Sequence, residues 1–126
     1  METTQKTSEA DRGHADGDTL TGIEHLYGSR SFNDLLRGNE AANLLRGFGG
    51  DDNLGGLEGS DTLEGGTGGD RLYGGEGFDY ASYVNSKSGI SIDLIGGDDA
   101  LGTGGDAEGD RFDSIEAVFG SEFDDM

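Results

Sequence analysis

The sequence predicts an all-β solenoid in which two nine-residue units close each coil. An Asp or Asn recurs every nine residues, an apolar residue follows each of them two positions later, and glycine recurs in the segments between. A fixed internal period of this kind indicates a repeat architecture. The acids and amide are Asp34, Asn43, Asp52, Asp61, Asp70 and Asp79, followed by Leu36, Leu45, Leu54, Leu63, Leu72 and Ala81.

Each unit divides into a turn and a very short strand. Glycine in the first six positions permits positive φ and a close approach of the backbone. The acid and the next three residues, such as residues 61–64, suit a strand with one inward side chain. Two turns and two strands close a coil of eighteen residues, so alternate units stack. We therefore expect Asp34, Asp52 and Asp70 along one edge and Asn43, Asp61 and Asp79 along the other.

Carboxylates stacked in this way repel one another unless a cation lies between them. Calcium takes six to eight oxygens from carboxylates and backbone carbonyls in flexible geometry, and glycine turns expose carbonyls. Magnesium requires a stricter octahedron and retains its waters. Zinc prefers His or Cys, and the chain has no Cys and two His. The pattern therefore predicts several calcium ions.

Composition and charge narrow the classes of function. Acids outnumber Lys plus Arg by 27 to 8, giving a net charge of −19, which attracts cations and repels nucleic acid and anionic membranes. The apolar content of 31% is typical of disorder. A disordered segment, a glycine linker or a solvated acidic face does not require leucine at every ninth residue. No apolar run is long enough for membrane insertion, and the absence of Cys excludes disulfides and thiolate metal sites.

The chain divides into a leader and one module. Residues 1–12 are polar, lack the apolar core of a signal peptide and predict a flexible leader. The module, 13–126, contains the nonapeptide core 29–82, an extension 83–110 and the start of a second long repeat at 105–126. Alternation of Ile90, Ile92 and Leu94 predicts a strand within 83–95, and the glycines and acids of 96–110 predict a mobile loop.

The second long repeat is visible as a matched string. Residues 105–121 match residues 13–29 at eight of seventeen positions, with an offset of 92. This duplication suggests either a segment of a larger tandem array or a gene truncated at Met126.

The units GGTGGDRLY (65–73) and GGEGFDYAS (74–82) resemble the GGxGxDxUx nonapeptide of the RTX family of hemolysin-type calcium-binding repeat proteins. The flanking strings are similar to the longer repeat blocks of large secreted bacterial members. The resemblance implies a right-handed parallel β-roll with calcium between adjacent turns, which folds on reaching calcium outside the cell. It also implies type I secretion through an uncleaved C-terminal signal, and a location outside a bacterium or on its surface.

The same resemblance implies the metal ligands position by position. Asp52, Asp61, Asp70 and Asp79 are the motif acids, and Asp34 and Asn43 occupy the same place in degenerate units. The main-chain carbonyls of the glycine turns would complete the shells: Gly47, Gly50, Gly56, Gly59, Gly65, Gly66, Gly68, Gly74, Gly75 and Gly77.

Other acids and both histidines have less specific interpretations. An extra ion is a second hypothesis for the matched acidic strings, which contain Asp16, Asp18, Asp106, Glu108 and Asp110. Glu24 and Glu116 share a matched position and are interpreted either as further ligands or as simple turn acids. Asp98 and Asp99 are interpreted as acids that solvate their loop, and His14 and His25 as surface or turn residues.

No catalytic constellation emerges from the sequence, and an EF-hand loop is absent. We therefore expect a calcium-binding structural module rather than an enzyme, with calcium and neighbouring repeats or an appended domain as partners. Two alternatives stay open. One is an accessory module of an extracellular protease, lipase or polysaccharide-modifying enzyme, and the other is an adhesive or matrix repeat.

Overall fold

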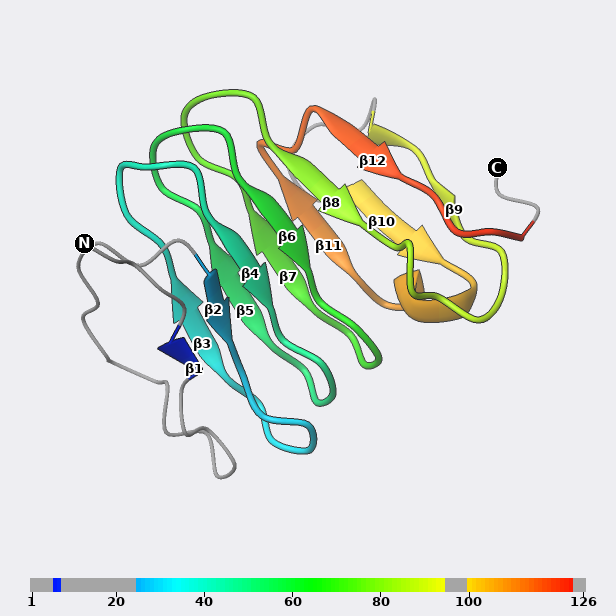
Figure 1. Ribbon diagram of the computed structural model, residues 1–126. Coiled ribbons are helices and arrows are strands. Elements are labelled where there is room, and N and C mark those ends of the chain that lie inside the picture. The colour runs from blue at the N-terminus through cyan, green and yellow to red at the C-terminus, as the bar shows by residue number, and fades with distance from the viewer. Residues whose placement is uncertain (1–5, 8–24, 95–99, 124–126) are drawn as a thin grey trace.

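The computed structural model describes residues 6–7, 25–94 and 100–123. Over residues 25–82, successive strands alternate between two facing sheets, and the coils stack along one axis (Figure 1). One sheet has the order β1-β2-β4-β6-β8-β12, and the other has the order β3-β5-β7-β11-β10-β9. None of the described residues forms a helix long and apolar enough to cross a membrane.

The strands are short throughout. They are β1 (Lys6–Thr7), β2 (His25–Tyr27), β3 (Leu35–Arg37), β4 (Leu44–Arg46), β5 (Asn53–Gly55), β6 (Thr62–Glu64), β7 (Arg71–Tyr73), β8 (Tyr80–Ser82), β9 (Ser91–Ile92), β10 (Ala100–Thr103), β11 (Arg111–Asp113) and β12 (Ala117–Phe119). A single 3-10 turn, η2 (Gly105–Ala107), is described between β10 and β11.

The register between strands confirms a coil of eighteen residues. Leu44 of β4 lies beside Thr62 of β6, which lies beside Tyr80 of β8, and all of these pairs are parallel. The β3-β5-β7 series in the other sheet keeps the same spacing. The all-β parallel solenoid with two units per coil is therefore confirmed.

A single file of side chains fills the space between the sheets. Neighbouring residues of a strand point to opposite faces, so only the middle residue of each three-residue strand points inward. These middle residues are 0–1% exposed from β3 to β8: Leu36, Leu45, Leu54, Leu63, Leu72 and Ala81. The expected inward file is confirmed, and the core is one side chain wide per strand.

The chain leaves the nine-residue period after β8 and returns to it later. Arg111 of β11 lies beside Arg71 of β7, and Ala117 of β12 lies beside Tyr80 of β8. These partners are 40 and 37 residues apart in the sequence. The intervening segment thus packs at the end of the solenoid and then supplies one further irregular coil.

The sequence-based account of that segment is only partly correct. Ile90 is buried, but the strand is confined to β9, with Ile92 and Leu94 partly buried. The loop expected over 96–110 is wrong in part, because β10 pairs antiparallel with both β9 and β11 and η2 follows it. Its inward positions, Ala100 and Gly102, are small, so no apolar alternation reveals the strand.

Several expectations concern residues outside the described ranges. These are the acids at positions 16, 18, 24, 98 and 99 and the histidine at position 14. Within the expected leader, β1 pairs parallel with β2, and nothing further of that segment is described.

Candidate metal centre

The acids at the turn–strand junctions form two hydrogen-bonded ladders, one on each edge of the solenoid. We call the series Asp34, Asp52, Asp70 and Asp110 the first ladder. In it, the backbone N–H groups of Asp34, Asp52 and Asp70 donate to the carboxylate Oδ1 one coil further on, at N···O distances of 2.7–2.8 Å. The two predicted edges are therefore present, and Asp110 extends the first of them.

The second ladder contains Asn43, Asp61, Asp79 and Glu116. The N–H groups of Asn43 and Asp61 donate to the next Oδ1 at 2.7 and 2.8 Å. Asp79 donates to Glu116 Oε2 at 2.8 Å. A glutamate thus ends this ladder in place of an aspartate.

In each of the four central acids the second carboxylate oxygen is left over. Oδ2 of Asp52, Asp61, Asp70 and Asp79 is buried and has no hydrogen-bond partner within the described ranges. The four side chains are 0–1% exposed. A buried anionic oxygen without a partner is strongly unfavourable, and such groups in proteins are paired or coordinate a metal. Four equivalent orphaned oxygens therefore indicate a repeated cation site.

Glycine is required where these oxygens approach the backbone. A Cβ atom added to Gly56 would lie 2.3 Å from Asp61 Oδ2 and 2.8 Å from the carbonyl oxygen of Gly74 in the next coil. At Gly47 the corresponding distances to Asp52 Oδ2 and the Gly65 carbonyl oxygen are 2.3 and 2.9 Å. A carboxylate oxygen and a carbonyl oxygen from adjacent coils thus converge beside a residue without a side chain.

The donor set is one of hard oxygens, which fits calcium. Among the residues that the structure describes, no group of three or more His, Cys, Asp or Glu side chains could hold a metal ion on its own. Any coordination shell would therefore have to include backbone carbonyls of the turns. Such mixed shells are usual for calcium, whereas zinc takes nitrogen and sulfur ligands.

Without a cation, burial disfavours the ionised form of these carboxyls, as their pKa values show. Burial raises the pKa of Asp52 and of Asp61 to about 7, and that of Asp70 to about 9. Burial also raises the pKa of Asp79. Repulsion between ladder neighbours adds to the effect, while the hydrogen bond from the previous coil opposes it. In the fold without a cation, these carboxyls therefore keep their protons to higher pH than in the unfolded chain.

The two degenerate units differ from the central four. Asp34 Oδ2 accepts hydrogen bonds from the Ser29 N–H at 2.6 Å and from Ser29 Oγ at 3.0 Å. Asn43 Oδ1 accepts the Asn39 N–H at 2.8 Å. Here protein donors satisfy the oxygen that is orphaned elsewhere, although Asp34 Oδ1 has no partner among the described residues.

The glycine turns adopt the positive φ angles that their motif permits. Positive φ angles of 94–114° occur at Gly66, Gly68, Gly75 and Gly77, and also at Gly50 and Gly59. In the units that lack the second glycine, Phe48 and Leu57 adopt φ of 76° and 79°. The turn conformation is therefore imposed by the stack even where the side chain disfavours it.

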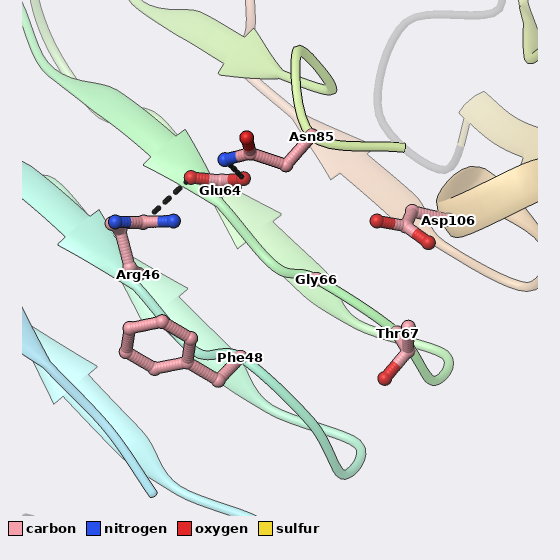
Figure 2. Close-up of a pocket in the computed structure, with 7 residues that line it drawn as sticks. All are labelled: Arg46, Phe48, Glu64, Gly66, Thr67, Asn85 and Asp106. Atoms are coloured by element: carbon pink, nitrogen blue, oxygen red, sulfur yellow. Dashed lines mark hydrogen bonds and ion pairs between the residues drawn. The ribbon is translucent and has the colours of Figure 1, made fainter. Parts of the chain in front are cut away.

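Outside the ladders, one small pocket lies on the outer face. It measures about 130 Å³ and is lined by Arg46, Phe48, Glu64, Gly66, Thr67, Asn85 and Asp106. Figure 2 shows Arg46 and Asn85 joined to Glu64, with Asp106 approaching from the other side. Asp106 lines this pocket and belongs to neither ladder, and Glu108 Oε1 accepts the Gly104 N–H. Of the five acids for which an extra ion was the hypothesis, three lie within the described residues, and among these only Asp110 joins a ladder.

The comparison with known families bears on the same residues. A family description, the RTX calcium-binding nonapeptide repeat, matches at 30–63 and 47–81, with four copies. Residues 30–81 are RTX repeats. RTX repeats bind calcium and are typical of secreted bacterial proteins, and the four acids with orphaned oxygens lie within the matched residues. No curated protein and no solved structure matches the chain.

The sequence singled out most of this centre, but it missed two groups. Ser29, which satisfies Asp34, stands in a unit where the motif has glycine, and an ST-turn signal was available there. Tyr83 donates its hydroxyl to Asp110 Oδ2 from 27 residues earlier in the sequence. No local pattern connects those two residues, so only the folded chain brings them together.

Proposed function

We propose that the chain is a calcium-dependent structural module of a secreted or surface bacterial protein, and that the RTX repeats fold when calcium binds. The observation that carries the proposal is the set of four buried Oδ2 atoms without partners. Each belongs to a motif acid, and the sites at Asp52 and Asp61 also present a carbonyl of the adjacent coil.

Calcium binding is expected to stabilise the folded roll, and not only to occupy a site that is already formed. Because the core is one side chain wide, each coil buries little apolar surface, and ionised acids in the ladders oppose stacking. Binding that occurs only in the folded state stabilises it by mass action. Each ion orders a coil against its neighbour, so we expect cooperative binding, as in other one-dimensional repeats.

The ligands are expected at Asp52, Asp61, Asp70 and Asp79, with carbonyl oxygens from the turns at Gly47, Gly56, Gly65 and Gly74. Asp34 and Asn43 are expected to contribute less, because Ser29 and Asn39 already donate to them. Magnesium is expected to be a poor substitute, since it retains water in an octahedral shell.

A calcium titration from EDTA tests the proposal by circular dichroism and sedimentation. The β signal and a compact sedimentation coefficient should appear together at roughly 10⁻⁴–10⁻³ M calcium, the range of extracellular modules. The same concentration of magnesium serves as the control and should produce much less structure. A chain that is compact and β-rich in EDTA at neutral pH, and that takes up no calcium, contradicts the proposal.

A further inference from the structure

The first ladder ends differently from its interior. At Asp52 and Asp70, Oδ1 accepts an N–H from the previous coil and Oδ2 is orphaned. At Asp110, Oδ1 accepts the Asp70 N–H at 2.7 Å, as in the interior. Asp110 Oδ2, however, accepts a hydrogen bond from the hydroxyl of Tyr83. The same oxygen that lacks a partner in the interior is therefore satisfied at the end.

Tyr83 is built into this position rather than resting on the surface. The residue is 1% exposed, and its ring lies edge-on to Phe112 at a centroid distance of 6.3 Å. Its N–H donates to the Phe119 carbonyl at 2.9 Å, and its own carbonyl accepts the Ser86 N–H at 3.0 Å. Both the backbone and the ring are thus fixed, which directs the hydroxyl at Asp110.

The place of Tyr83 in the repeat explains why it can end the series. It stands eighteen residues after Gly65, where a further coil would begin with glycine. The Gly65 carbonyl lies beside the Asp52 carboxylate, so the equivalent backbone atom for Asp70 would come from residue 83. At that residue the chain instead turns away and places a phenol inside the roll.

We propose that Tyr83 takes the place of a calcium ion at the C-terminal end of the first ladder, so that Asp110 is a structural residue and binds no calcium. The inference rests on the proposed function, because it defines where the calcium series stops. The second ladder ends instead at Glu116, an exposed side chain whose Oε2 accepts the Asp79 N–H, while Asp79 Oδ2 is orphaned and lies near the Ser114 carbonyl across Gly74. The two edges therefore end asymmetrically.

Calcium stoichiometry, measured by equilibrium dialysis on the full chain, tests the proposal. Asp110→Asn keeps an Oδ1 acceptor for Asp70 and should bind the same number of ions as wild type. Asp52→Asn is the matched variant in the same ladder, because it keeps an Oδ1 acceptor for the Asp34 N–H and its carboxylate lies beside the Gly65 carbonyl, and it should lose one ion. Tyr83→Phe keeps the ring but frees Asp110 Oδ2, and it should gain one ion. Adding Asp110→Asn to Tyr83→Phe should remove that gain.

Loss of an ion in Asp110→Asn, or an unchanged count in a folded Tyr83→Phe, overturns the inference. If Tyr83→Phe does not fold in calcium, Asp110→Asn decides alone. Failure of the proposed function is distinguishable, because wild-type protein would then bind no calcium at all.

Discussion

Replacing Asp70 by Asn should change stability in opposite directions with and without calcium. The substitution keeps the Oδ1 that accepts the Asp52 N–H at 2.8 Å, but it removes the charge of the most strongly perturbed ladder acid. Without calcium, that charge opposes folding. With calcium, it is a ligand. The expected result is therefore a metal-free roll that is more stable and a calcium-loaded roll that binds its ions less tightly.

The magnitude follows from the pKa of Asp70. Burial raises it from 3.8 to about 9, so at pH 7 the folded chain holds a proton that the unfolded chain has released. At pH 7 the folding penalty is set by the interval between this pH and the unfolded-state pKa of 3.8, which is roughly three pH units. At about 1.4 kcal/mol per unit, the free-energy cost of folding is about 4 kcal/mol. Asp70→Asn should recover no more than this in EDTA. In calcium, the midpoint should move to higher calcium concentration, chiefly for ions on the edge shared with Asp52.

Urea unfolding followed by circular dichroism, in EDTA and in calcium, measures both effects. If wild-type protein lacks structure in EDTA, the gain appears as β signal in the variant before urea is added. Glu76→Gln removes one charge from an exposed side chain and is the matched control, with an expected change within about 0.5 kcal/mol. A variant that is destabilised equally in EDTA and in calcium refutes the electrostatic argument.

Three further predictions address pH, glycine and strain. In EDTA, β structure should increase on acidification. The folded-state pKa values of about 7 for Asp52 and Asp61 and about 9 for Asp70 exceed the ordinary value of 3.8, so the folded chain binds more protons than the unfolded chain. The stability that these groups contribute below pH 4 is therefore lost as the pH rises through 7 to 9. Circular dichroism that does not change between pH 5 and 9 in EDTA contradicts this. Gly56→Ala should abolish the calcium-induced β signal, because the new Cβ would lie 2.3 Å from Asp61 Oδ2, whereas Gly55→Ala, with nothing within 4 Å, should fold normally. Equal behaviour of these neighbours would show that the close approach is unimportant. Leu57→Gly should stabilise the calcium-loaded roll by about 1 kcal/mol in urea unfolding, because Leu57 is 44% exposed and has φ of 79°. A loss of stability would show that the leucine side chain contributes more than its strained backbone costs.

The nine-residue spacing was sufficient to predict the regular part of the molecule. Inward positions, coil length and the assignment of acids to two edges all follow from local rules, namely the alternation of side chains along a strand and the glycine requirement of a turn. Leu63 and Asp61 lie where the period places them, one between the sheets and one in a ladder. Repetition makes such predictions robust, because every coil has the same neighbours.

The tertiary structure alone decided how the series begins and ends. Ser29 satisfies Asp34, Glu116 completes the ladder of Asp79, and Tyr83 meets Asp110 across 27 residues. The β10 strand was equally hidden, since Ala100 and Gly102 point inward without an apolar pattern. At the ends of a solenoid a residue no longer packs against a copy of its own unit. Its partners are then chosen by the path of a non-repeating segment, and no local spacing records that path.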